Sequence, residues 1–212
     1  MAFQNAEGKP VLLRMVAAIQ ENKAHLSEID GLIGDGDHGM NMNKGFTVFG
    51  ERVREKEVSF TGGLSQLGML LLGEIGGSMG PIYGAVFTGM AEAGEGLEEL
   101  GTAEMAAMLE AGLNGLYDLV DARVGDKTLV DTLSPARDAL RKAASDGLDF
   151  ASALRQMKEA ADAGCQSTKG LTAKYGRSSR LGERSRGVLD AGAASCAILL
   201  NAMADAILEL GV

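Results

Sequence analysis

Three aspartates within a glycine-rich stretch constrain this chain more than any other feature. Asp30, Asp35 and Asp37 are separated only by glycines and apolar residues. Two carboxylates about 4 Å apart repel each other by roughly 4 kcal/mol at an effective dielectric constant near 20. Gly34 and Gly36 permit tightly turned backbone conformations that other residues avoid. We therefore expect a loop that curls its carboxylates around a hard cation, and Mg²⁺ is the ion that we predict.

Two other interpretations of the aspartates have to be weighed. Part of the loop reads Asp-x-Asp-x-Gly, which is similar to a calcium-binding EF-hand, but the twelfth position of such a loop should be a bidentate Glu. Counted from Asp35 the twelfth residue is Phe46, and counted from Asp30 it is Asn41. The second alternative is structural, because aspartates are common turn formers and helix N-caps. The motif alone leaves that alternative open.

Apolar residues recur at helical spacing along most of the chain, and no stretch alternates between apolar and polar residues as a half-buried strand would. Pro10 and Pro81 each suit the first turn of a helix. The chain of 212 residues suits a single domain, 1–212, with a sizeable core. We predict an all-α, antiparallel up-and-down bundle of eight helices. The expected helices lie near residues 9–26, 38–55, 64–75, 81–90, 102–122, 126–145, 150–161 and 188–210.

Several local features of this bundle bear on a binding site. The second helix begins beside the aspartate loop, so its backbone N–H groups and the positive end of its dipole should lie next to the cation. Residues 76–81, which read Gly-Gly-Ser-Met-Gly-Pro, present bare backbone at another helix start. In the fifth helix we expect Leu119 to face the core. Asp126 or a neighbouring residue should cap the sixth helix.

The charge and composition of the chain exclude several functions. A formal net charge of -9 disfavours nucleic-acid binding, because a phosphate backbone demands a cationic surface. The longest apolar run, 67–72, is far shorter than the ~20 residues that cross a bilayer, so we expect no membrane segment. Cys165 and Cys196 are the only cysteines, and no leader pattern precedes the first helix. We therefore expect a cytoplasmic protein.

One segment reverses the acidic character of the chain. Between Lys169 and Arg186, six basic residues accompany one acid, Glu183, which gives a local charge of +5. The surrounding stretch, 166–187, is rich in Gly and Ser and shows no sustained helical period, and a loop of that length is usually functional. We predict a lid that is mobile alone and ordered by phosphate groups. Docking of an acidic partner surface is the alternative.

Four stretches of the chain resemble the signature of the dihydroxyacetone kinase nucleotide-binding (L) subunit family. They occur in the family's order and spacing, so the resemblance covers nearly the whole chain: 34–45, 76–81, 125–128 and 181–185. The resemblance implies an eight-helix up-and-down barrel with a nucleotide at one end. No Gly-x-x-x-x-Gly-Lys-Ser/Thr sequence occurs, which excludes a P-loop.

The resemblance also implies specific site residues and cofactors. Asp30, Asp35 and Asp37 would hold two Mg²⁺ ions that bridge the phosphates of ADP or ATP. Whether ATP is an exchanging substrate or ADP a permanently held cofactor is left open. The nucleotide itself would be bound by His38, Gly39, Met40, Asn41, Gly77, Ser78, Met79, Gly80, Thr128, Arg177, Asp190, Ala191 and Gly192.

The chain departs from the family pattern at several positions. The family usually reads Gly-Gly-x-Ser-Gly in the phosphate turn, whereas this chain has Ser78 one place early and Met79 in the serine position. A contact through a side-chain hydroxyl is therefore in doubt, while backbone contacts would survive. Arg180 replaces a frequent aromatic residue, and Ala191 and Ala194 replace a common Pro and Thr. These changes could mark a subgroup with a different partner or sugar.

The chain lacks a residue that would hold the sugar. Related kinases bind their ketose through a histidine on a separate substrate-binding domain, and this chain has only His25 and His38. The resemblance thus implies a substrate-binding (K-type) partner subunit, and it leaves open an M-type phosphocarrier partner and a homodimer. Two rival functions also stay open. One is the nucleotide domain of a fatty-acid kinase, whose related motif has Thr in place of His38, and the other is a regulatory module that binds ADP.

Overall fold

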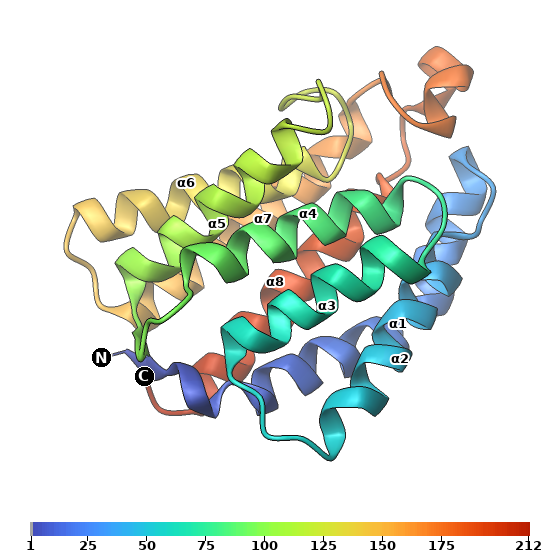
Figure 1. Cartoon of the computed structure of the whole chain (residues 1–212). Helices are drawn as coiled ribbons and strands as arrows, with labels where there is room; N and C mark the ends of the chain where they lie inside the picture. Colours follow the sequence, from blue (N-terminus) through green and yellow to red (C-terminus); the bar gives the residue numbers. More distant parts are fainter. Residues whose placement is uncertain (1) are drawn as a thin grey trace.

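Eight α-helices account for most of the chain in a computed structural model that describes residues 2–212 (Figure 1). Each helix packs against the next one along the chain, and α8 packs against α1, so the helices close into a ring. This arrangement confirms the predicted all-α, eight-helix up-and-down barrel. The helices are α1 (Lys9–Ile33), α2 (His38–Arg54), α3 (Phe60–Glu74), α4 (Met79–Ala93), α5 (Thr102–Tyr117), α6 (Val130–Ser145), α7 (Phe150–Ser167) and α8 (Ala191–Glu209).

Helix α1 is longer than predicted. The sequence interpretation ended it near residue 26, because glycines and an aspartate follow. Ile29 and Ile33 continue the buried stripe of the helix, with 5% and 6% of their surfaces exposed, and this burial outweighs the low helix propensity of the intervening glycine. As a result, Asp30 lies in the last helical turn of α1 and not in the loop.

Helix α5 is shorter than predicted, and the expectation for Leu119 was wrong. The helix ends at Tyr117, and Leu119 is 55% exposed. The guanidinium of Arg123 stacks over the Tyr117 ring, 4.3 Å from its centroid, and donates to the carbonyls of Val120 and Ala122. These contacts fold the chain back after the helix, so the residues that follow Tyr117 leave the helical path.

Asp126 itself does not cap α6, but its neighbour Thr128 contributes, because the Thr128 hydroxyl accepts a hydrogen bond from the backbone N–H of Val130 at 3.2 Å. The helix starts at Val130, and the residue before it, Leu129, makes no side-chain cap. The carboxylate of Asp131 accepts hydrogen bonds from the backbone N–H groups of Gly125 (2.6 Å) and Thr128 (2.8 Å). The turn before α6 is therefore held by an aspartate inside the first helical turn.

Two details differ from the all-helical expectation. Strands β1 (Phe3–Gln4) and β2 (Glu99–Leu100) form a short antiparallel pair. Each strand has only two residues, which is too few for a sequence pattern to reveal. By length and composition, helix α8 could cross a membrane, which the search for uninterrupted apolar runs in the sequence did not indicate. It contributes to the core of the barrel, with 72% of that stretch buried, as a core helix does.

The connections place different functions at the two ends of the barrel. The chain ends lie close together at one end, and the segment between α7 and α8 lies at the other, where it is orange in Figure 1. That segment contains two 3₁₀ turns, η2 (Thr168–Gly170) and η3 (Arg177–Ser185). It therefore contains more regular structure than the loop that the sequence predicts. We call residues 169–187 the lid segment.

Candidate functional site

The three aspartates of the sequence motif lie together where α1 passes to α2. Asp30 is in the last turn of α1, and Asp35 and Asp37 lie in the connection that follows. Oxygen atoms of the three carboxylates lie within 4.8 Å of one another. The backbone N–H of His38 donates to Oδ2 of Asp30 at 3.3 Å, so the start of α2 orients that carboxylate. Convergent carboxylate oxygens of this kind are the donor set of a hard cation.

Two glycines let the loop fold back on the end of α1. A Cβ atom at position 34 would lie 2.3 Å from Oδ1 of Asp30, so the backbone approaches that carboxylate more closely than a side chain allows. Gly36 has a φ of +77°, in the left-handed region that favours glycine. Both positions explain the glycine pattern in the motif.

A cation from the lid segment already approaches the aspartates. Arg177, the first residue of η3, forms an ion pair with Asp35. Three carboxylates and one guanidinium leave an uncompensated formal charge of about -2, and like charges this close repel one another. A divalent cation is the species that would balance this charge.

The other basic residues of the lid segment are used differently from the prediction. Lys174 pairs with Asp126, and Arg186 pairs with Glu183. Within residues 2–212, Arg177 is the basic residue of the segment that reaches the cavity described next. The local charge of +5 is thus partly neutralised by neighbours and is not all directed at one ligand.

A cavity of about 410 Å³ opens beside the carboxylates. Its volume is within the range of about 300–1,000 Å³ that is typical of small-molecule sites. The lining combines the acidic cluster, the first residues of several helices and an aliphatic wall, so the cavity offers both charged and apolar surface. The wall consists of Ile33, Ile82, Leu116, Val120, Ala122 and Leu129.

Four helices begin at this cavity. Because consecutive helices run in opposite directions, α2, α4, α6 and α8 all start at the same end of the barrel, and the first residue of each lines the cavity. The first N–H groups of a helix have no partner within the helix, and the helix dipole adds about half a positive charge there. At the start of α4, Gly77 has a φ of +76°, and the Ser78 side chain makes no capping bond. Such helix starts are well suited to bind phosphate oxygens.

The start of α8 carries an aspartate with a perturbed pKa. Asp190 caps the helix by accepting a hydrogen bond from the backbone N–H of Ala193 at 2.8 Å. Burial raises the pKa of Asp190 to about 6, although this hydrogen bond and the charge of Lys127 both act to lower it. The carboxylate is therefore partly protonated in mildly acidic solution.

A hydrogen-bonded chain connects His38 to the middle of the barrel. Nε2 of His38 lies 2.8 Å from Oγ of Ser195, which lies 2.6 Å from the hydroxyl of Tyr83. Both hydroxyls are within hydrogen-bonding distance of the Gly192 carbonyl, at 3.2 Å from Tyr83 and 3.1 Å from Ser195. Burial lowers the pKa of His38, with Asp30 opposing the shift. The network therefore holds a neutral imidazole in a fixed orientation beside the cavity.

The structure brings most of the predicted site residues to the cavity. Asp30, Asp35 and Asp37 line it together with the predicted nucleotide-binding residues His38, Asn41, Gly77, Ser78, Met79, Thr128, Arg177, Asp190, Ala191 and Gly192.

Three predicted residues, however, lie outside the lining of the cavity. Met40 is 56% exposed on the surface. Gly39 and Gly80 serve helix packing, since a Cβ atom would lie 1.9 Å from the carbonyl oxygen of Lys23 at the first position and 2.2 Å from that of Ile75 at the second. The predicted contact of their backbone with a nucleotide is not tested by this packing and stays a prediction.

Sequence reasoning missed the aliphatic wall and two buried polar residues, Tyr83 and Lys127, that also line the cavity. Leu116 follows the helical spacing of a core residue, so its pattern gives no sign of a cavity. The only available signal was its position at the end of a helix, next to the other helix starts.

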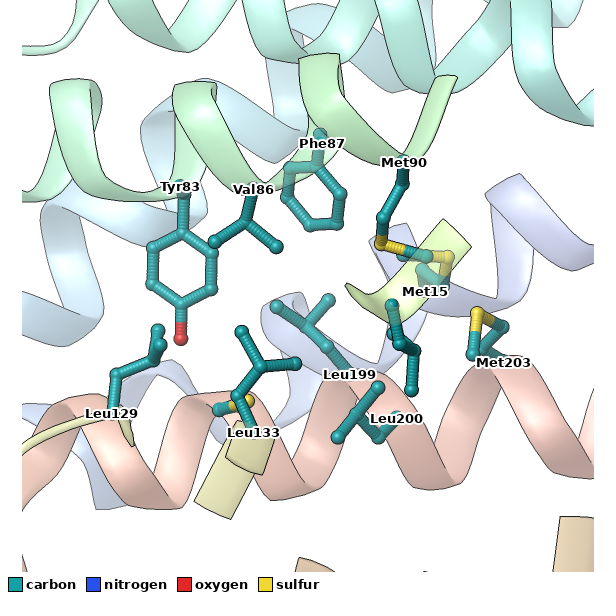
Figure 2. Close-up of a pocket in the computed structure, with 12 residues that line it drawn as sticks. Met15, Tyr83, Val86, Phe87, Met90, Leu129, Leu133, Leu199, Leu200 and Met203 are labelled. Atoms are coloured by element: carbon teal, nitrogen blue, oxygen red, sulfur yellow. The ribbon is translucent and has the colours of Figure 1, made fainter. Parts of the chain in front are cut away.

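A second, much smaller cavity lies inside the barrel and has a volume of only about 20 Å³. Figure 2 shows Tyr83, Phe87 and Met90 of α4 opposite Leu199 and Met203 of α8, with apolar side chains filling the space between the helices. The space has about the size of one water molecule. It is a packing defect of the core, and the larger cavity at the end of the barrel is the candidate site.

Residues 32–205 match the DAK2 domain. The chain belongs to the DAK2 domain family. This match and the relatives below confirm the resemblance on which the sequence interpretation rests.

Two DAK2 relatives are nearly the same length as this chain. The first is the PEP-dependent dihydroxyacetone kinase 1, ADP-binding subunit DhaL, of Listeria innocua serovar 6a, with 38% identity over 87% of this chain and 88% of that protein. The second is the PEP-dependent dihydroxyacetone kinase, ADP-binding subunit DhaL, of Escherichia coli K12, with 36% identity over 87% of this chain and 89% of that protein.

A solved structure shares the DAK2 fold. The dihydroxyacetone kinase from C. freundii in complex with AMP-PNP and Mg²⁺ superimposes with a TM-score of 0.70 at 22% identity. The superposition covers 97% of this chain and 34% of that longer chain. The likeness supports the helical barrel as the common architecture.

Proposed function

We propose that this chain is the nucleotide-binding subunit of a dihydroxyacetone-type kinase, which passes a phosphoryl group from a Mg²⁺-bound nucleotide to a small ketose held by a partner subunit. One observation carries the proposal: three convergent carboxylates and four helix starts face the same cavity, which also has an aliphatic wall. Phosphoryl transfer requires little covalent chemistry from the protein and depends on positioning and charge stabilisation. The cavity offers both.

The acidic end of the cavity fits the metal and phosphate part of the ligand. Asp30, Asp35 and Asp37 would hold two Mg²⁺ ions, which neutralise phosphate charge when they are bound. The starts of α2, α4, α6 and α8 would donate backbone hydrogen bonds to phosphate oxygens. Arg177, which pairs with Asp35 here, would exchange that partner for a phosphate oxygen. In each case the protein supplies fixed dipoles and charges that need little rearrangement during transfer.

The aliphatic wall fits the nucleoside. Ile82, Leu116 and Val120 offer apolar surface to a base, and Leu129 adjoins them in the lining. Apolar contact and exclusion of water would stabilise the flat ring by burying its faces. The wall presents few polar side chains, so we expect most of the binding free energy to come from the phosphate end.

The ketose would be held by another polypeptide. His25 is exposed on α1, and His38 is hydrogen-bonded to Ser195. Neither histidine is placed in the cavity as a free nucleophile for a sugar carbonyl. A K-type subunit that covers the mouth of the cavity would bring the acceptor hydroxyl to the nucleotide. A homodimer of this chain is a separate prediction that does not supply this function.

We further propose that ADP stays bound and is recharged in place by a phosphocarrier partner of M-type. The names of both relatives of similar length describe an ADP-binding subunit of a PEP-dependent kinase. A bound ADP would accept a phosphoryl group at its β-phosphate and hand it to the ketose. Tight retention suits a cavity that the lid segment lines and whose negative charge two metal ions would balance.

A binding and activity experiment tests the proposal. The isolated chain should show a higher melting temperature with Mg²⁺ and ADP, because a ligand that binds only the folded state stabilises it, and should not phosphorylate dihydroxyacetone with ATP. Activity should require a K-type subunit. After prolonged dialysis, ADP should remain bound in about equal amount to protein, and a phosphocarrier system should restore turnover. Sugar phosphorylation by the lone chain would refute the two-subunit proposal, and rapid loss of ADP would favour ATP as the substrate.

A further inference from the structure

Lys127 combines two unfavourable features beside the cavity. Its side chain is only 1% exposed, and a lysine is almost never so buried unless its charge is paired. Its backbone has a φ of +61°, and among residues 2–212 it is the one non-glycine residue with positive φ. Such strain persists where the surrounding structure requires it and often marks a functional position. Neither feature is explained by metal or phosphate binding.

The ammonium group of Lys127 joins the two ends of the lid segment. Nζ donates to the carbonyl oxygens of Thr168 and Val188, each at 2.5 Å. These residues stand immediately before and after the lid segment, which spans 169–187. A backbone hydrogen bond from Gly187 to the carbonyl of Lys169, at 2.8 Å, also connects the two ends.

The residue before Lys127 holds the first third of the same segment. The carboxylate of Asp126 pairs with Nζ of Lys174 at 2.5 Å, and the Asp126 carbonyl accepts a hydrogen bond from the Lys174 N–H at 3.2 Å. Asp131 fixes the turn that carries both residues, through bonds to Gly125 and Thr128. The turn at 125–128 is therefore a rigid base to which the lid segment is attached at its two ends and at Lys174.

The positive φ of Lys127 lets two consecutive side chains, those of Asp126 and Lys127, both reach the lid segment. Successive side chains of an extended chain point to opposite sides, whereas a left-handed residue turns the chain sharply. Here Asp126 reaches Lys174 while Lys127 reaches Thr168 and Val188. A lysine is suited to this position because its ammonium group has three donors and the two carbonyls are acceptors only.

We propose that Lys127 is a positioning residue, which clamps the ends of the lid segment and thereby holds Arg177 over the aspartates. The proposal rests on the proposed function in so far as Arg177 contacts a nucleotide, but the clamp itself exists without one. It refines the sequence prediction of a mobile loop, because only the part between fixed ends is free to open. The clamp requires a hydrogen-bond-donating cation at Nζ of Lys127 and does not involve a metal ion.

Hydrogen exchange without Mg²⁺ or nucleotide tests the clamp on the full chain. The N–H of Asp190 is a further reporter of the clamp, because it donates to Oγ1 of Thr168 at 3.0 Å. In Lys127→Met, which keeps the length of the side chain but removes the ammonium, the N–H groups of Lys174, Gly187 and Asp190 should exchange about tenfold faster, because loss of a charged hydrogen bond favours local opening. The control Lys142→Met removes an exposed lysine that pairs with Asp146 on α6, and it should leave these rates unchanged. Equal rates in wild type and Lys127→Met would overturn the proposal.

A second variant keeps the test decisive if Lys127→Met does not fold. Lys127→Ala leaves space for a small amine, so n-propylamine should restore slow exchange at Gly187 and Asp190, whereas n-propanol at the same concentration should not. Restoration by both compounds would mean that only volume matters and would overturn the clamp.

These experiments distinguish failure of the proposed function from failure of the clamp. If wild-type protein shows no melting shift with Mg²⁺ and ADP, the nucleotide site is refuted while the exchange comparison still reports on Lys127. If ADP binds and the clamp is correct, ADP should dissociate about tenfold faster from Lys127→Met than from Lys142→Met.

Discussion

Replacement of Asp37 by Asn should stabilise the metal-free protein and abolish Mg²⁺-dependent nucleotide binding. Asp37 is the better choice for this test than Asp35, because Asp35 also pairs with Arg177. In Asp35→Asn the loss of that attraction would offset the relief of repulsion. The carboxylate of Asp37 interacts with those of Asp30 and Asp35 within 4.8 Å, so removal of one charge eliminates two repulsive pairs.

The magnitude follows from Coulomb's law. Two unit charges 4.8 Å apart repel by about 3.5 kcal/mol at an effective dielectric constant of 20 and by about 0.9 kcal/mol in bulk water. Asp37 is exposed, so the lower figure applies to each pair. We expect the free energy of unfolding to rise by about 1–2 kcal/mol, which corresponds to a Tm increase of about 2–8 °C for a chain of this size.

Two measurements check this prediction. Thermal melting in EDTA at low ionic strength gives the stability change, which should shrink in high salt as the repulsion is screened. Calorimetry with ADP and Mg²⁺ gives the loss of binding. Asp121→Asn is the control, because Asp121 is exposed and lies outside the cluster, and neither quantity should change. A lower or unchanged Tm in Asp37→Asn would refute the repulsion argument, and undiminished ADP affinity would refute the metal site.

Two further predictions concern pH and packing. Because burial raises the pKa of Asp190 to about 6, its contribution to stability is full below the unfolded-state pKa near 3.8 and is lost as the pH rises through 6. Asp190→Asn keeps the oxygen that caps α8, so in the absence of metal and nucleotide the variant and the wild type should be equally stable near pH 4. At pH 7 the variant should be more stable by at most about 3 kcal/mol. Urea unfolding measures the difference, and a difference that does not change with pH would contradict this prediction. Gly39→Ala should destabilise by about 1–3 kcal/mol, because its Cβ would meet the Lys23 carbonyl at 1.9 Å. In contrast Gly73→Ala, whose Cβ meets nothing within 4 Å in the exposed part of α3, should stabilise by up to about 1 kcal/mol, and equal melting temperatures for the two variants would contradict the packing argument.

The sequence pattern predicted helices better than helix ends. Helical spacing of apolar residues located all eight helices, since each helix buries an apolar stripe. The end of α1 was misplaced because Asp30 and Gly31 are poor helix residues, and only the packing of Ile29 and Ile33 keeps that turn helical. At the end of α5 the decisive contact, Arg123 over Tyr117, has no periodic signature. At both positions, tertiary contacts and not local helix propensity decide where the helix ends.

The charged part of the candidate site was predictable, and the rest was not. Clustered carboxylates and glycines are costly without a ligand, so the sequence itself points to them. The cavity wall uses residues such as Leu116 that have the same pattern as the core. Lys127 stands between Asp126 and Thr128 in a polar stretch that indicates an exposed turn, and its burial depends on the carbonyls of Thr168 and Val188 far along the chain.

The fold alone does not make this end of the barrel positive. Where α2, α4, α6 and α8 begin, α1, α3, α5 and α7 end, and the negative ends of their dipoles would cancel the field of the helix starts. Two cations bind carbonyls near such ends: Arg123 donates to those of Val120 and Ala122 in the turn that follows α5, and Lys127 donates to that of Thr168 directly after α7. At the end of α1, a metal ion held by Asp30 would instead offset the negative end of the helix dipole. Lys127 and Arg123 thereby weaken the negative field of two helix ends near the cavity. Once a metal ion balances the charge of the aspartates, both residues would raise the affinity of the cavity for phosphate.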